Sequence, residues 1–198
     1  SVEDALTLFK NAAGLCGPAL TGFELMPRIG VEFTARHIAG VRDPLETVHP
    51  WYVLIDISTS DSAETAERMM TALLEQGFEA GLVQDATIAS SETQQKALWH
   101  MRESMSDAQK PEGGSIKHDI SVPVAAVPDF IAEADAAVVR LIPGARPVPF
   151  GHLGDGNIHY NVSQPIGANT ADFMSRWHEV NEVVFAIVLR KGGAISAG

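Results

Sequence analysis

The 198-residue sequence predicts an α+β fold: a ferredoxin-like sandwich with a mostly antiparallel sheet and helices on one face. Stretches with helical spacing of apolar residues alternate along the chain with short stretches typical of strands. Two strand candidates are separated by only four residues, Leu153 to Gly156, and this spacing predicts a hairpin with antiparallel pairing. The sequence has no glycine-rich strand-to-helix turn of the phosphate-binding kinds, so we expect no nucleotide-binding core.

The first quarter of the chain is expected to be less regular than the rest. Residues 2–14 have apolar residues at helical spacing and end in a glycine, which predicts a helix. Residues 19–27 are interpreted as a short strand and residues 28–40 as a short helix. A loop predicted at 42–50 separates this N-terminal extension, residues 1–49, from the core of the domain.

The core, residues 50–198, begins with the apolar run "WYVLIDIS", which predicts a buried strand. The following helix has Ser and Asp residues at its start and Gly77 at its end, and the next one opens with a Ser-to-Glu pair typical of a capping box. Pro128 lies near the first turn of a third helix, where proline is tolerated. The last helix ends in Arg190 and Lys191, which suit the negative end of a helix dipole. We therefore predict strands at 51–58, 80–89, 117–124, 145–152 and 157–164, and helices at 59–77, 90–105, 127–144 and 169–193.

The composition is that of an ordinary globular protein and excludes several functional classes. A net charge of −11, with only 14 Lys and Arg residues, argues against a nucleic-acid partner. The sequence has no apolar run long enough for a membrane span, and its acidic start lacks the basic region of a signal peptide, so we expect a cytoplasmic location. Cys16 is the only cysteine, so no disulfide can form within the chain, and we interpret it as a small packing residue.

The segment "PFGHLGDGNIHYNV", residues 149–162, contains the first candidate site. If the "LGDG" residues form the turn, His152 pairs with Asn157, and alternation along the strand puts His159 and Asn161 on the same face. The two histidines are then diagonal neighbours, roughly 7 Å apart at the backbone, and their imidazoles can converge on one divalent metal ion. The alternative is a plain hairpin whose imidazoles form hydrogen bonds in the wall of a cleft.

Other residues bear on this metal hypothesis. Asp155 is expected either to brace the turn or to accept a hydrogen bond from a ring nitrogen of a histidine. The sequence shows no third ligand in a matching motif. The remaining histidines are scattered and are expected on solvated faces: His37, His49, His100, His118 and His178.

A second candidate site combines Arg102, Ser106 and Lys117. Arg102 and Ser106 are four residues apart in a predicted helix, so they share a face, and Lys117 begins the next strand. A guanidinium, a hydroxyl and an ammonium together would bind the carboxylate of an organic acid. The alternative is a solvated helix end with a lysine nearby.

The segments "WHMRESM", "IKHDISVPV", "GHLGDGNIHYNV" and "RKGGAISA", in this order, resemble the C-terminal domain of the FAD-linked oxidases. The family includes enzymes of the glycolate oxidase, D-lactate dehydrogenase and D-2-hydroxyglutarate dehydrogenase types. The resemblance is strong from about residue 50 onward and weak before it. It implies a substrate or cap domain that covers the flavin, and an N-terminal FAD-binding domain that is absent from this sequence.

The resemblance also implies roles for particular residues. His152 and His159 would bind a divalent metal, usually zinc in members of the D-2-hydroxyglutarate dehydrogenase type. Contacts to substrate are implied for Arg102, Ser106, Lys117 and Asn161, with Ser106 standing where the family commonly has threonine. The family motif continues with a glutamate ligand and a catalytic histidine, whereas this sequence has Gly198 at the glutamate position. No catalytic residue is therefore assigned, and we expect the chain by itself to be inactive and not to retain FAD.

The implied reaction is oxidation of a D-2-hydroxy acid of the glycolate, lactate or 2-hydroxyglutarate type to the 2-oxo acid. An electron-accepting protein or subunit is the implied further partner. Two other functions stay open on the residues alone. One is a metal-dependent hydrolase that uses His152, His159 and Asp155, and the other is a non-catalytic ferredoxin-like module that binds a small acid. Neither accounts for all four matched segments.

Overall fold

A seven-stranded antiparallel sheet runs through the computed structural model, which describes residues 1–195. The order of neighbouring strands is β2-β1-β5-β6-β4-β7, and the short β3 also pairs with β6. The strands are β1 (Leu20–Pro27), β2 (Trp51–Ile57), β3 (Ser115–Ile116), β4 (Asp119–Ser121), β5 (Arg146–His152), β6 (Asn157–Ser163) and β7 (Ala194–Ile195). The α-helices are α1 (Val2–Cys16), α2 (Arg28–His37), α3 (Ala63–Glu79), α4 (Glu92–Glu103), α5 (Met105–Ala108), α6 (Val127–Leu141), α7 (Thr170–Ser175) and α8 (Trp177–Arg190).

The C-terminal half has the ferredoxin-like connectivity that the sequence predicts. Its elements follow one another as β4-α6-β5-β6-α8-β7, a β-α-β-β-α-β unit, and its strands lie in the spatial order β7-β4-β6-β5. The N-terminal strands β1 and β2 extend this sheet at the β5 edge. The α+β class and the antiparallel sheet are therefore confirmed.

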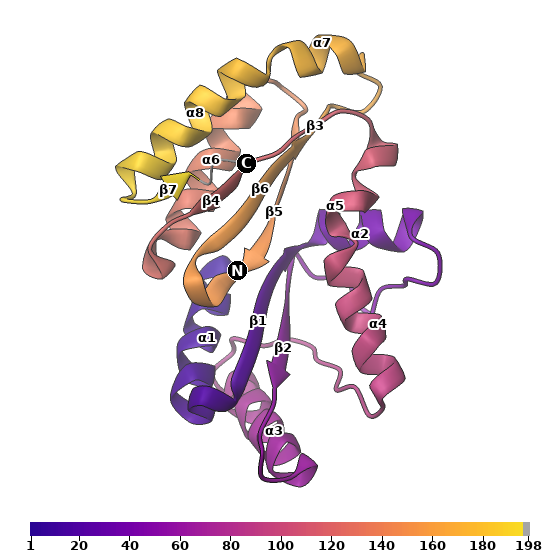
Figure 1. Cartoon of the computed structure of the whole chain (residues 1–198), viewed down its shortest axis with the longest axis vertical. Coiled ribbons are helices and arrows are strands. Elements are labelled where there is room, and N and C mark those ends of the chain that lie inside the picture. Colours follow the sequence, from indigo (N-terminus) through magenta and orange to yellow (C-terminus); the bar gives the residue numbers. More distant parts are fainter. Residues whose placement is uncertain (196–198) are drawn as a thin grey trace.

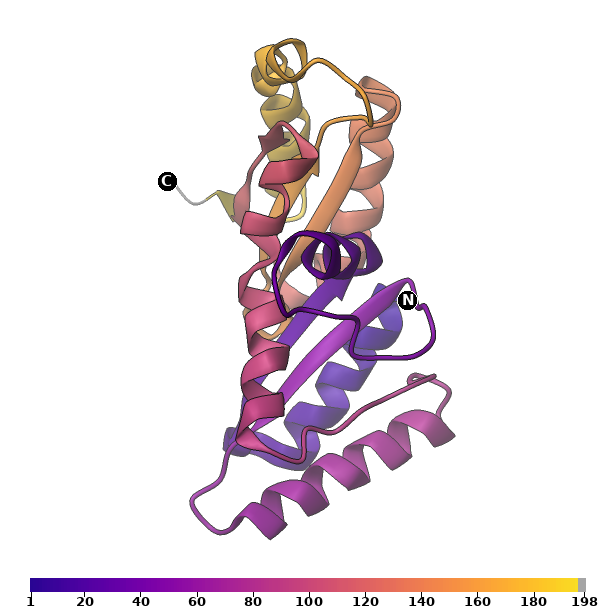
Figure 2. The same ribbon diagram turned by 90° about the vertical axis from the view of Figure 1, so that its right-hand side faces the viewer.

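Helices cover both faces of the sheet, whereas the sequence suggests one covered face. In Figure 1, α1, α6 and α8 lie on one side of the strands and α2, α4 and α5 on the other, and Figure 2 shows α4 and α5 crossing in front of the strands. The side chains of β2 explain why both faces are covered, because successive residues point to opposite faces and pack into two different hydrophobic cores. Trp51, Val53 and Ile55 pack with the α1 and α6 side, and Tyr52 and Leu54 pack with the α2 and α4 side.

The first quarter of the chain is more regular than its pattern suggests. α1 starts with a capping box between Ser1 and Asp4, and β1 is an interior strand between β2 and β5. Cys16 is buried, in agreement with a packing role. Within residues 1–195, no helix is both long enough and apolar enough to cross a lipid bilayer.

Three local predictions are corrected by the structure. The strand predicted at 80–89 is a loop, because Val83 packs against Gly77 of α3 and not on the sheet. The long helix predicted at 169–193 is divided at Arg176, which has non-helical backbone angles and ends α7. The helix predicted at 90–105 is likewise interrupted at Ser104, between α4 and α5. The strand β7, which the sequence analysis did not predict, pairs with β4.

Candidate functional site

The β5–β6 hairpin has the predicted geometry. His152 pairs with Asn157, and Phe150 pairs with His159. Residues opposite each other in neighbouring strands share a face, so both imidazoles lie on one face of the sheet, together with Phe150. That face carries the core formed with α2, α4 and α5. The turn between the strands is a short 3-10 segment closed by Gly156 in the left-handed conformation.

His152 is held by a carboxylate from a strand distant in sequence. Its Nδ1 lies 2.8 Å from Oε1 of Glu24, the residue directly opposite it in β1. The other carboxylate oxygen of Glu24 accepts a hydrogen bond of 2.8 Å from Nε of Arg102 in α4. Glu24 thus joins one predicted metal ligand to one predicted substrate contact.

His159 has an analogous partner. Its Nδ1 contacts Oδ1 of Asp119, the residue opposite it in β4. A carboxylate only accepts hydrogen bonds, so in both histidines Nδ1 carries the hydrogen. Among the described residues, Nε2 of neither ring has a hydrogen-bond partner. Each imidazole therefore presents a free Nε2 lone pair when it is neutral.

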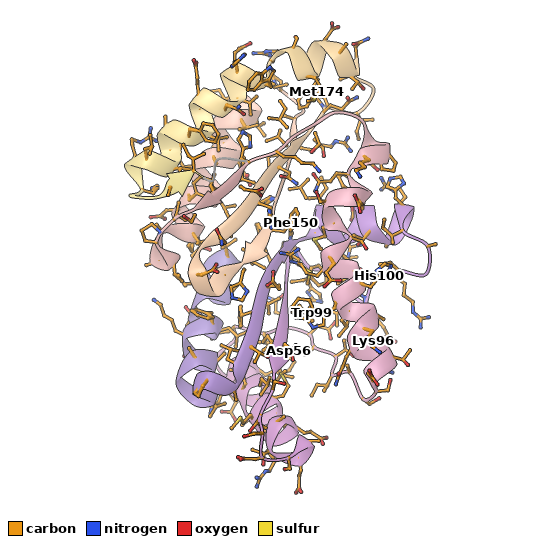
Figure 3. All side chains as sticks on the ribbon, in the orientation of Figure 1. Asp56, Lys96, Trp99, His100, Phe150 and Met174 are labelled. Carbon is orange, nitrogen blue, oxygen red and sulfur yellow. The ribbon has the colours of Figure 1, made fainter. Side chains whose placement is uncertain are left out.

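Phe150 connects the arginine to the second histidine. The guanidinium carbon of Arg102 lies 4.9 Å from the centre of the Phe150 ring, a cation–π contact. The Phe150 ring also contacts the His159 ring, and the two ring centres are 5.0 Å apart. Figure 3 shows Phe150, from β5, and Trp99, from α4, both lying between the strands and the helices.

Lys117 and Ser106 form a direct pair, in which Nζ donates to Oγ over 2.7 Å. Arg102 belongs to α4 and Ser106 to α5, so the two are not on one continuous helix as predicted. The Arg102 side chain is only 13% exposed, and in the described structure only its Nε donates to a protein acceptor. Its two terminal NH₂ groups are therefore available to an anion.

Asn161 is buried at 2% exposure on the same face as His159, two residues further along β6. No side-chain hydrogen bond joins it to another described residue. Two residues further along the strand, the hydroxyl of Ser163 is fully buried without a partner, and it is the only such side-chain group among the described residues. Buried polar groups without partners are uncommon in proteins.

Cavities alone do not locate this site. A cavity of about 290 Å³ lies between α1, β1 and the hairpin turn, and His152 and Phe9 contribute to its wall. A larger one, about 530 Å³, lies between α6 and α8, in the helix layer of the opposite face, and has no histidine in its wall. We therefore define the candidate site by its side chains: the two histidines, Arg102, Ser106, Lys117 and Asn161.

Three neighbours of the site were not identified from sequence: Glu24, Phe150 and Asp119. A charged residue within the apolar strand "LTGFELMP" was the available signal for Glu24. Asp155 braces the turn, since its Oδ1 accepts from the backbone N–H of Asn157 over 3.0 Å. The Nδ1 atoms of His152 and His159 bond Glu24 and Asp119, so the alternative role of Asp155 as their acceptor is corrected.

His118 does not lie on a solvated face. It is 2% exposed, and its ring nitrogens bond the carbonyl oxygen of Tyr160 and Oδ1 of Asn181 at 2.7 and 2.8 Å. Burial lowers the pKa of its imidazole, although both hydrogen bonds act to raise it. His118 points to the α8 side of the sheet, away from the candidate site.

A complete metal site is not formed by residues 1–195. No group of three or more His, Cys, Asp and Glu side chains in this part of the chain could hold a metal ion. His152 and His159 thus supply two imidazole ligands. Gly198, at the position for which the resemblance implies a glutamate ligand in the family, lies outside the described residues.

Comparisons with known proteins agree with the resemblance. The family model for the C-terminal domain of FAD-linked oxidases matches residues 1–198. A D-2-hydroxyglutarate dehydrogenase of Xanthomonas citri pv. viticola is 34% identical over 178 residues, which are 90% of this chain and 37% of that protein. Another, from Stutzerimonas stutzeri, is 38% identical over 154 residues, 78% of this chain and 32% of that protein.

A putative mitochondrial D-lactate dehydrogenase of Schizosaccharomyces pombe is also similar. It is 28% identical over an alignment of 207 residues, which covers 100% of this chain and 38% of that protein. The chain therefore spans about a third of the length of these relatives.

Proposed function

Because the chain belongs to the family of FAD-linked oxidase C-terminal domains, we propose that it is the substrate-binding domain of a flavin-dependent enzyme. The proposed reaction is oxidation of a D-2-hydroxy acid to the corresponding 2-oxo acid. The relatives named for D-2-hydroxyglutarate and D-lactate support a substrate of this class, and we include glycolate as a smaller member of it. The proposed partners are an FAD-binding domain and an electron-accepting protein or subunit.

One observation carries the proposal. Two imidazoles and an arginine with free NH₂ groups lie on one face of the sheet, and Glu24 and Phe150 link them in a continuous series of contacts. An α-hydroxy acid carries a hydroxyl and a carboxylate on the same carbon, and this face offers groups for both. A plain hairpin with solvated histidines would need neither a buried arginine nor the buried polar side chains of Asn161 and Ser163 on the same face.

We propose His152 and His159 as ligands of a divalent ion such as zinc. The fit rests on the donor set: each ring donates its Nδ1–H to a carboxylate, which leaves Nε2 free, and such carboxylate–histidine pairs are typical around protein zinc. Two ligands do not complete a site, so the remaining ones would come from substrate, solvent or residues beyond the described part.

The mechanism assigns binding and orientation to this chain. The oxidation removes the hydroxyl proton, which a base would take, and the α-hydrogen with its electron pair, for which FAD would supply the acceptor. A divalent ion held by His152 and His159 would supply a positive charge that polarises the hydroxyl. Arg102 would hold the carboxylate through its two terminal NH₂ groups in a bidentate contact, and the Nζ of Lys117 adds a second positive charge. Asn161 supplies an amide to the hydroxyl end. Phe150 keeps one side of the arginine free of water.

The two alternative functions, a metal-dependent hydrolase and a non-catalytic module that binds a small acid, are less well supported. Residues 1–195 contain no group of three metal ligands with an acid that could activate water, as a hydrolase site would require. A module that only binds a small acid would use Arg102 and Lys117 but would leave the paired histidines without a role.

The proposal is tested with the full-length protein that contains this chain. Dye reduction is measured with both enantiomers of lactate and 2-hydroxyglutarate and with glycolate. Arg102→Ala should lower kcat/KM about 100-fold, because orientation of the carboxylate is lost. Arg68→Ala, in α3 on the opposite face, removes an exposed arginine that bonds only Thr65 and should leave kcat/KM unchanged.

Metal content provides the second test. His152→Ala and His159→Ala should release zinc, whereas His178→Ala, at an exposed position of α8, should not. No oxidation of any of these acids by the wild-type protein, or equal kcat/KM in the Arg102→Ala protein, would reject the proposed function. If both histidine variants keep the zinc content of the wild-type protein, the assignment of His152 and His159 as ligands is rejected, and the proposed function is not affected.

A further inference from the structure

Glu24 is a carboxylate in the interior of the sheet. It lies in β1 between β2 and β5, and its side chain is only 8% exposed. Glutamate is almost never buried to this extent unless it is paired, because removing the charge from water is costly. The strand otherwise contributes apolar side chains such as Phe23 and Leu25 to the core. A charge at this position therefore requires a structural or functional reason.

The two oxygens of Glu24 serve two different groups. Oε1 accepts from Nδ1 of His152 and Oε2 accepts from Nε of Arg102, each at 2.8 Å. The strand register places Glu24 directly opposite His152, whereas Arg102 reaches it from α4 across the face of the sheet. Each oxygen of the carboxylate thus accepts from one charged or polar partner, an imidazole on one side and a guanidinium on the other.

These two bonds fix the orientation of both partners. Acceptance from Nδ1 selects the His152 tautomer with a free Nε2, which is the nitrogen that would meet a metal ion. Acceptance from Nε leaves both terminal NH₂ groups of Arg102 for a bidentate contact with a substrate carboxylate. The Phe150 ring under the guanidinium then restricts rotation of its plane.

We propose that Glu24 is a positioning residue that holds the metal-facing histidine and the carboxylate-binding arginine in one fixed geometry. The inference rests on the proposed function and deepens it, because it couples the two halves of the site. Removing the carboxylate should weaken metal binding and substrate binding together, although Glu24 touches neither ligand. A residue that only stabilised the fold would not have this double effect.

The chain contains a matched control for this experiment. Glu112 is also largely buried, at 11% exposure, and also pairs with a histidine and with arginines: His37 at 2.6 Å, Arg146 at 2.6 Å and the more exposed Arg36 at 2.7 Å. It joins the end of α2 to the start of β5, and Arg146 lies at the opposite end of β5 from His152. Loss of either glutamate removes the same kinds of bonds, but only Glu24 adjoins the site.

Glu24→Gln and Glu112→Gln are made in the full-length protein. Glutamine keeps the size of the side chain but replaces one carboxylate oxygen with an NH₂ group, which cannot accept the hydrogen bond from the partner on that side. In Glu24→Gln we expect the zinc dissociation constant, measured without substrate by competition with a chromophoric chelator, to rise about 10- to 100-fold. The KM for the hydroxy acid should rise as well. In Glu112→Gln the melting temperature should fall while both constants stay at their wild-type values.

The outcomes separate the inference from the proposed function. If the wild-type protein oxidises hydroxy acids but the zinc constant and KM of Glu24→Gln stay within about twofold of its values, Glu24 is merely structural and the inference fails. A wild-type protein that neither binds zinc nor oxidises these acids overturns the proposed function itself. Should Glu24→Gln yield no folded protein, Glu24→Asp keeps the charge but shortens the reach, and is judged by the same two constants.

Discussion

Asp135 is a carboxyl group whose ionisation should destabilise the fold. It lies in α6, and Oδ1 accepts a hydrogen bond of 2.8 Å from the hydroxyl of the fully buried Tyr160. Burial raises the pKa of Asp135 to about 6, although the bond from Tyr160 acts to lower it. Burial and the neighbouring carboxylate also raise the pKa of Tyr160, so the tyrosine stays a hydrogen-bond donor.

The sign of the pH effect follows from proton counting. In the unfolded chain Asp135 loses its proton near pH 3.8, and in the folded chain near pH 6. Between these values the folded state holds more protons, so its stability falls as the pH rises through the window. A shift of two pKa units corresponds to about 3 kcal/mol, which is an upper limit because Asp135 keeps some contact with water.

Asp135→Asn removes this titration and preserves the acceptor for Tyr160. Near pH 7.5 the variant should be more stable by about 1–2 kcal/mol, which corresponds to a rise in Tm of about 2–8 °C for a chain of this size. Near pH 4 the wild-type carboxyl is protonated and resembles the amide, so the two proteins should melt together. Thermal unfolding followed by far-UV circular dichroism at both pH values measures the difference.

A second carboxylate on the same helix serves as the control. Hydrogen bonding from Lys191 lowers the pKa of the exposed Glu133, in spite of the small opposing effect of burial. Its contribution is therefore present at neutral pH and is lost as the pH falls through the lowered pKa, so Glu133→Gln should lower Tm more near pH 7.5 than near pH 4. Equal Tm differences between Asp135→Asn and wild type at both pH values would refute the reasoning about Asp135.

Three further predictions concern packing and the site. Gly156→Ala should lower the free energy of unfolding by more than about 2 kcal/mol, since Gly156 has φ of 72° and an added Cβ would overlap the carbonyl oxygen of Val122. Gly40 has a similar φ of 79° but open space around it, so Gly40→Ala should cause a smaller loss in the same denaturant unfolding assay. Leu73→Ala in α3 should cost about 2–5 kcal/mol in the same assay, because the side chain is fully buried, and a loss below about 1 kcal/mol would contradict the packing described for α3. Phe150→Leu should raise the KM for the hydroxy acid several-fold with little loss of stability, whereas Phe173→Leu, at a similarly buried position in α7, should leave KM unchanged. Equal KM values in the two variants would remove Phe150 from the site.

The parts of the fold that depend on near neighbours in sequence were predictable. The hairpin could be placed because four turn residues and strict alternation determine which side chains share a face, and His152 and Asn157 pair as expected. Helix ends were similarly marked by caps such as Ser62 and Ser91. The roles of the six predicted site residues stay predictions, although the structure places the histidines and Arg102 within one set of contacts.

What was missed depends on contacts between distant segments. Glu24 and His152 are 128 positions apart, and no local pattern connects them. The segment at 80–89 is apolar enough for a strand, but its Val83 is used to cover α3. His118 has no sequence feature that distinguishes it from the exposed histidines, since its burial depends on the approach of α8.

The N-terminal strands join the sheet of the ferredoxin-like half through a short stretch of strand pairing. β1 meets β5 at only two residue pairs, Glu24 with His152 and Leu25 with Gly151. The candidate site therefore lies across the boundary between the N-terminal strands and the ferredoxin-like part of the sheet. Sliding of β1 along β5 would separate Glu24 from His152. A ligand bound to both His152 and Arg102 would resist such sliding, so amide hydrogen exchange in β1 is expected to slow when substrate occupies the protein.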